Sequence, residues 1–136
     1  MIGRLDVAIL IGCLGAGLVV AVPRHAQIGT QARVAEVAAL ASAASTSAEL
    51  AHSRWLAAAR PQTITGRRGL IAMTHGYPSA ATLSLMLAEA ETAAFVSDGG
   101  TWRHAGLPAG SACGVAYLPP AADAQPPKII SYTDDC

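Results

Sequence analysis

The chain has 136 residues, which is enough for one domain. Hydrophobic residues make up 52% of the sequence and aromatic residues only 4%, because alanine supplies much of the total. Charged residues are scarce at 13%, and nine basic residues balance nine acidic ones. A net charge near zero lacks the electrostatic signature of proteins that bind nucleic acid or anionic lipid.

An uncharged apolar run lies near the start of the sequence. It extends from Val7 to Val22, 16 residues, and reaches 18 counted from Leu5 if Asp6 is tolerated near its edge. As a helix, 18 residues span roughly 27 Å, close to the hydrocarbon thickness of a bilayer. Three interpretations are open: a cleaved secretory signal, a lipoprotein signal ending at Cys13, or an anchor that continues as a helix.

The residues around the run favour the anchor. A secretory signal needs a positively charged start, whereas Asp6 places an acid there. Nine apolar residues follow Cys13, where a mature lipoprotein would begin a polar tether. We therefore predict that residues 1–24 form the apolar first half of a long helix.

The sequence after Pro23 predicts that the helix continues over residues 25–60. This segment is rich in alanine, glutamate, arginine and leucine, and no glycine or proline occurs between Thr30 and Arg60. Apolar residues at helical spacing predict one buried stripe, which consists of Val34, Val37, Ala41, Ala44, Ala48, Ala51 and Trp55. A second stripe lies alongside it and consists of Leu40, Ala43, Ser47 and Leu50. We expect the C-terminal half of the helix to pack against the protein's own head.

Residues 61–136 predict a small head rich in β-strands. We expect a polar turn at Thr63–Arg68, a strand at Gly69–Thr74, a turn at Gly76–Pro78 and a short helix within Pro78–Glu91. Further strands are expected at Ala93–Val96, Thr101–His104, Cys113–Leu118 and Lys128–Tyr132, the first two joined by a hairpin turn. The resulting fold class is α+β, with a small antiparallel sheet packed on the long helix.

The three cysteines divide into one apolar residue and one pair. Cys13 lies in the apolar run and behaves as a small hydrophobic residue. Cys113 and Cys136 enclose the last hairpin and suit a disulfide in an oxidising compartment, the alternative being two free thiols. On a loop-entropy estimate, a closed loop of about 24 residues contributes roughly 3 kcal/mol.

No group of residues in the sequence points to catalysis. His25, His52, His75 and His104 are widely spaced and lack a metal-ligand pattern. The sequence has no GxSxG nucleophile motif and no phosphate-binding glycine loop. Glu49 precedes His52 by three residues on the expected helix, which favours a surface pair. We predict no enzymatic activity, no cofactor and no metal.

Several of these features together resemble a type IV pilin. Asp6 precedes the apolar run, and Gly15 lies eight residues before Pro23, a spacing typical of the family. The stretch Ala21–Ala58 is particularly similar to the mannose-sensitive haemagglutinin type of pilin. Gly76-Tyr77-Pro78 and the cysteine pair near the end are similar as well.

Two features depart from the family pattern. Asp6 stands where these proteins typically carry a glutamate, so the acid is one methylene shorter. Met1 stands where the glycine before the prepilin cleavage site would lie, and no basic leader precedes it. We expect a misplaced start codon, a processed form or an altered cleavage, with no consequence for the fold.

The resemblance implies a fold and an assembly mechanism. Residues 1–24 would be the helix half that spans the membrane and later lies in the filament core, residues 25–60 its amphipathic continuation, and residues 61–136 the head with its C-terminal disulfide loop. Asp6 would pair with the amino terminus of a neighbouring subunit, and Gly15–Pro23 would lose helical structure in the filament. A buried pair of this kind specifies register more than it adds stability.

The resemblance also implies a function and a location. The subunit would polymerise into a type IV pilus used for adhesion and motility, after a single-pass stage in the inner membrane. Its partners would be copies of itself, the prepilin peptidase that processes and methylates it, and the inner-membrane assembly machinery. Two alternatives stay open: a pseudopilin of type II secretion, and a membrane-tethered periplasmic binding module that does not polymerise.

Overall fold

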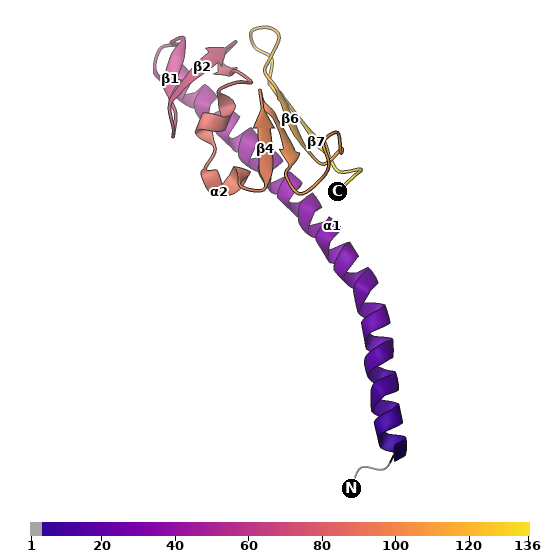
Figure 1. Ribbon diagram of the computed structural model, residues 1–136. Coiled ribbons are helices and arrows are strands. Elements are labelled where there is room, and N and C mark those ends of the chain that lie inside the picture. Colours follow the sequence, from indigo (N-terminus) through magenta and orange to yellow (C-terminus); the bar gives the residue numbers. More distant parts are fainter. Residues whose placement is uncertain (1–3) are drawn as a thin grey trace. The chain divides into compact units, whose positions relative to one another are not determined.

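A computed structural model describes the backbone of residues 4–136 and the side chains from residue 29 onward. Helix α1 spans Arg4–Ala57 (Figure 1). The chain divides into two compact units, residues 1–32 and residues 33–136. The first unit contains the beginning of α1. The second, called the head unit below, contains the rest of α1 and all the strands that the structure describes.

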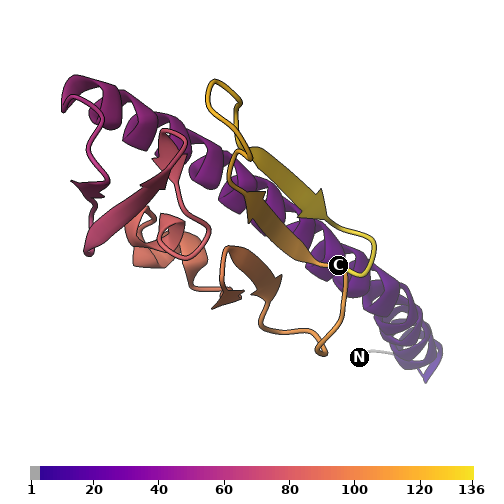
Figure 2. The same cartoon turned by 90° about the horizontal axis from the view of Figure 1, so that it is seen from above.

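Two antiparallel sheets make up most of the head unit. The first has the order β1-β2-β3, with bounds Thr63–Thr65, Leu70–Thr74 and Tyr77–Pro78. The second has the order β4-β5-β6-β7, with bounds Phe95–Asp98, Thr101–His104, Gly114–Leu118 and Lys128–Tyr132. A 3-10 helix, η1 (Leu83–Met86), and a short helix, α2 (Glu89–Thr92), lie between them. The predicted α+β class is confirmed (Figures 1 and 2), with two sheets instead of the single one expected.

The predicted polar turn at Thr63–Arg68 is wrong in its first half. Thr63–Thr65 forms β1 and pairs with β2, where Ile64 lies opposite Ile71. Ile64 is buried between two exposed threonines, so the segment alternates as a half-buried strand does. The turn itself is shorter than predicted, and the N–H of Gly66 donates to the carbonyl of Gly69 at 2.8 Å.

The helix predicted within Pro78–Glu91 is interrupted. Its backbone becomes extended at Leu87, with ψ 146°, and again at Ala88, with ψ 151°. The interruption carries Leu87 into the core, where it is fully buried, and leaves Ala90 exposed. Helical periodicity therefore predicted correctly which leucines are buried. It did not predict the extended backbone conformation at Leu87 and Ala88, which is determined by packing.

The buried face of α1 follows the first predicted stripe and includes one residue of the second. Its buried residues are Val37, Leu40, Ala44, Ala48 and Ala51. Leu40 comes from the second predicted stripe, whereas Leu50 of that stripe is 46% exposed and Val34 of the first is 37% exposed. The buried positions are three or four residues apart, so they follow a line nearly parallel to the helix axis.

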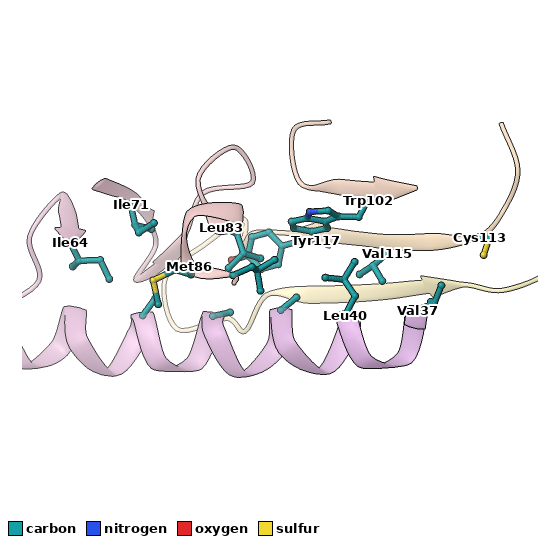
Figure 3. Packing of buried hydrophobic residues seen from close by; sticks show 14 of the residues in the cluster. Val37, Leu40, Ile64, Ile71, Leu83, Met86, Trp102, Cys113, Val115 and Tyr117 are labelled. Carbon is teal, nitrogen blue, oxygen red and sulfur yellow. The ribbon is translucent and has the colours of Figure 1, made fainter. Parts of the chain in front are cut away.

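The core of the head unit forms between this face and the strands. Figure 3 shows Leu40 and Val37 projecting from α1 toward residues of the strands and η1. The largest fully buried side chain is Trp102 on β5, and Val115 and Tyr117 on β6 belong to the same cluster. Because several helix positions are alanine, the strands supply most of the bulk of this core.

The hairpin predicted around Ser97–Gly100 is present with a tighter turn. The strand before it is Phe95–Asp98, so two residues, Gly99 and Gly100, connect it to β5. Both have positive φ, 56° and 92°, as a two-residue hairpin turn requires. Gly100 is also buried, and a Cβ there would lie 2.9 Å from the backbone oxygen of Ala80. This turn therefore needs glycine for both conformation and space.

Candidate functional site

The residues predicted to direct assembly lie in the first unit. Asp6, Gly15 and Pro23 belong to the backbone of α1, and their side chains fall outside the part of the chain whose side chains the structure describes. The side chains of the predicted apolar half, residues 1–24, also lie outside that part of the chain. Within residues 29–136, whose side chains the structure describes, no helix is both long enough and apolar enough to span a membrane.

The predicted disulfide is present in the head unit. Cys113 and Cys136 are bonded, with their Cα atoms 5.0 Å apart, and both are buried. Beside them, the N–H of Ala112 donates to Oδ2 of Asp135 at 2.7 Å, and the N–H of Asp135 donates to the carbonyl of Ala112 at 3.1 Å. The disulfide therefore closes the open end of the β6–β7 hairpin.

Two contacts join the first turns of α1 in the head unit to this end of the sheet. Nε of Arg33 donates to the main-chain oxygen of Cys136 at 2.5 Å. Oε2 of Glu36 lies 2.7 Å from Nε2 of His104, the last residue of β5. Both contacts come from polar side chains beside the buried face of α1. They therefore fix this part of α1 against the second sheet at the edge of the core.

A cleft of about 650 Å³ lies at the opposite end of the α1 segment in the head unit. It is formed by the C-terminal end of α1, the β2–β3 turn and the loop between β6 and β7. Its rings come from His52, Trp55 and Tyr77, and its charged or polar lining residues include Arg60, His75 and Asp123. The cleft thus combines aromatic surface with several polar groups, as small-molecule sites do.

His52 is the centre of the aromatic side of this cleft. Its ring is parallel to that of Tyr77, with centroids 4.3 Å apart, and lies 5.6 Å from that of Trp55. Nδ1 of His52 lies 2.6 Å from the carbonyl oxygen of Gly76, so Nδ1 carries the hydrogen and donates it. The predicted surface pair with Glu49 is therefore wrong, because His52 turns toward the β2–β3 turn.

The polar side of the cleft is open to solvent. Nδ1 of His75 lies 2.7 Å from Oδ1 of Asp123, and these side chains are 37% and 92% exposed. Such an exposed pair contributes little to stability. The guanidinium carbon of Arg60 lies 5.6 Å from the ring centroid of Trp55, whose Nε1–H donates to the carbonyl of Pro61 at 2.9 Å. The indole is thus held in one orientation beneath the cation.

Two tyrosines behind the cleft have shifted acidity. Burial raises the pKa of the Tyr117 hydroxyl well above its usual range, with smaller contributions from Tyr77 and Glu49. That hydroxyl donates to the carbonyl of Pro78 at 2.7 Å. Burial also raises the pKa of Tyr77, with a smaller contribution from Glu49. Both groups are therefore neutral hydrogen-bond donors at physiological pH.

Sequence reasoning did not find this cleft. His52 and Trp55 are three residues apart on a helix, and this spacing places them on one face. Tyr77 lies in a segment that the sequence marked only as a turn. Asp123 comes from the proline-containing loop between β6 and β7, whose position no local pattern predicts. The helix spacing was the one available signal.

The chain was compared with known protein families, with curated proteins and with solved structures, and none of the three comparisons found a match. Within residues 29–136, no group of three or more histidine, cysteine, aspartate or glutamate side chains is arranged to hold a metal ion.

Proposed function

We propose that the chain is a structural subunit of the type IV pilin kind, which polymerises through its N-terminal helix into a surface filament used for attachment. The observation that carries this proposal is the division of α1. Residues 37–51 of the helix supply one side of the core of the head unit, whereas residues 7–22 form an uncharged run in the other unit. Such a run needs an apolar environment, and identical helices supply one when subunits leave a membrane.

The free side of α1 in the head unit supports the same proposal. Ala35, Ala38, Ala39 and Ser42 are exposed on the helix, away from the buried face. Small side chains let a neighbouring helix approach closely. A second copy of the chain could therefore pack its helix along this side without rearranging the head.

The disulfide and the acid in the apolar run complete the proposed pathway. Disulfides such as Cys113–Cys136 persist outside the reducing cytosol. On this proposal the subunit is first a single-pass inner-membrane protein, is processed by a prepilin peptidase, and is then assembled by inner-membrane machinery. Asp6 pairs with the amino terminus of the neighbouring subunit during assembly.

Expression of the full chain in a host that carries a type IV pilus assembly system tests the proposal. We expect sheared surface fractions to contain filaments of this chain, and mass spectrometry to show a methylated first residue. Asp6→Ala should lower the filament yield at least tenfold, since removing one partner of a buried pair costs roughly 3–5 kcal/mol. Asp98→Ala, at an exposed position in the hairpin, is the matched control and should assemble normally.

Two results would contradict the proposal. One is a chain that stays monomeric in the inner membrane while the host's own pilin still forms filaments. The other is an Asp6→Ala variant that reaches the membrane at normal levels and assembles as well as the Asp98→Ala control.

The cleft beside Trp55 favours a second candidate function, a membrane-tethered binding module. An open cleft of about 650 Å³ lined by aromatic and charged residues is not required for polymerisation. This candidate predicts a monomer that binds a ligand and forms no filaments. Filaments in the sheared fraction decide between the two candidates, because a pure binding module would yield none.

A further inference from the structure

The backbone around the cleft adopts unusual conformations. In the described part of the chain, the non-glycine residues with positive φ are Ala59, Arg60, His75 and Ala124, at 62°, 60°, 51° and 62°. Three of them line the cleft, and Ala59 immediately precedes Arg60. Glycine normally occupies such positions at helix ends and in tight turns. Non-glycine residues in this region cost about 1–3 kcal/mol each and cluster at functional sites.

Two of these positions carry chemically useful side chains. Arg60, just past the end of α1, brings a guanidinium group to the cleft, and His75, in the β2–β3 turn, brings an imidazole. A glycine at either position would relieve the backbone and remove the group. Both residues are exposed, so their side chains are not needed for packing of the core. The free-energy cost of their backbone conformation is therefore not offset by burial of these side chains.

The imidazoles of the cleft are oriented in the same manner. Nδ1–H of His52 donates to the carbonyl of Gly76, and Nδ1 of His75 is paired with Oδ1 of Asp123. In each ring Nε2 has no hydrogen-bond partner among the residues that the structure describes. When protonated, an imidazole held in this way offers Nε2–H as a charged donor.

We infer that the cleft binds a small ligand in which a carboxylate is attached to a flat apolar group. Arg60 supplies a permanent cation for the carboxylate, and His52 and His75 supply donors beside it when protonated. Trp55 and Tyr77 supply ring faces for the apolar group. This inference is independent of the proposed function, because it concerns the head of a single subunit.

The charges around the cleft agree with an anionic ligand. Among the described residues that line the cleft, Arg60 is the only permanent cation and Asp123 the only acid, with Oδ1 already paired with His75. Glu49 on α1 acts on Tyr77 from outside the lining, and both Tyr77 and Tyr117 are neutral donors. Arg60 is therefore the group positioned to contact a carboxylate, and its guanidinium stays charged at every accessible pH.

An NMR titration of the full chain in detergent micelles with benzoate tests the inference. The indole N–H signals of the two tryptophans make it specific: Trp55 lines the cleft, whereas Trp102 lies buried in the core and serves as an internal control. We expect benzoate to shift the Trp55 signal and leave that of Trp102 unchanged. Benzamide, which has the same shape without the charge, should bind at least about tenfold more weakly, as expected for a lost charged contact.

Variants test the role of the guanidinium group. Arg60→Gln should weaken benzoate binding by about tenfold at every pH. Arg67→Gln, an exposed arginine between β1 and β2, is the matched control and should bind as the parent does.

The inference would be overturned by equal binding of benzoate and benzamide, by binding that is unchanged in Arg60→Gln, or by no shift of the Trp55 signal at about 20 mM benzoate, where even a weak site with a Kd in the millimolar range is occupied. The carboxylate could belong to a small organic acid or to an acidic side chain of a peptide. The blocked dipeptide N-acetyl-Phe-Glu-amide is therefore a second probe, and whichever probe binds more tightly identifies the source. Filament formation has no part in this measurement, so the two proposals fail separately.

Discussion

Glu36 and His104 are 68 positions apart in sequence, and Oε2 of Glu36 lies 2.7 Å from Nε2 of His104. The N–H of Gly106 donates to Nδ1 of the same imidazole at 3.2 Å, so the hydrogen of the neutral ring is on Nε2 and is donated to the carboxylate. The His104 side chain is 13% exposed and that of Glu36 is 48% exposed. One hydrogen bond thus joins the end of β5 to α1 at the rim of the core.

This contact should contribute modestly to stability. We expect Glu36→Ala and His104→Ala each to lower the free energy of unfolding by about 0.5–1.5 kcal/mol, the lower part of the range being favoured because Glu36 is open to solvent. Urea unfolding of both single variants and the double variant measures the coupling. Fully additive effects would show that the two side chains do not interact.

The two leucines of α1 should respond differently to truncation. Leu40 is 1% exposed and Leu50 is 46% exposed on the same helix. Leu40→Ala should lower the free energy of unfolding by about 2–5 kcal/mol, because it removes buried contacts and leaves a cavity. Leu50→Ala should change it by less than about 1 kcal/mol. Chemical denaturation compares them, and equal effects would contradict the assignment of the buried face.

Tyr117 should make the protein sensitive to alkali. Its pKa is raised in the folded state by burial, so the unfolded chain loses this proton first, near pH 10 for an ordinary tyrosine. The stabilisation is complete below about pH 10 and is lost as pH rises further, by up to about 1.4 kcal/mol per pH unit. Unfolding followed from about pH 8 to pH 12 should show this slope in the parent protein.

The matched variants for Tyr117 are Tyr117→Phe and Tyr132→Phe. Tyr117→Phe should flatten the alkaline slope and cost about 1–2 kcal/mol at neutral pH, because the hydrogen bond to the carbonyl of Pro78 is lost. Tyr132 is 43% exposed, and its replacement should change neither quantity appreciably. Tyr77, whose pKa is also raised, should leave a smaller slope in Tyr117→Phe, and a slope as steep as that of the parent would refute the assignment.

Reduction of the disulfide should weaken the head unit. Dithiothreitol should lower the free energy of unfolding by roughly 2–4 kcal/mol, since the closed loop limits the unfolded chain. The variant with both Cys113→Ser and Cys136→Ser should match the reduced protein and show no further response to the reductant. A loss below about 0.5 kcal/mol would mean that the pairs beside the bond, such as Ala112 with Asp135, already hold the hairpin closed.

Local patterns in the sequence sufficed for the class of fold and for most of its strands. Hydrophobic spacing predicted the α1 segment of the head unit, and alternation with glycine-containing turns predicted β2, β5, β6 and β7 within a residue of their bounds. The cysteine spacing predicted the Cys113–Cys136 bond. These features follow from the periods of helices and strands and from turn chemistry, which act over a few neighbouring residues.

Tertiary structure decided the features that depend on distant segments. The backbone breaks at Leu87 because the core requires that side chain, and the buried face of α1 includes Leu40 and excludes Leu50 because of where the strands lie. His52 pairs with Gly76 instead of Glu49 for the same reason. The sequence by itself thus determined most of the elements and the disulfide between Cys113 and Cys136. Packing between segments tens of residues apart determined the face of α1 that is buried and created the cleft, because such contacts leave no period in the sequence.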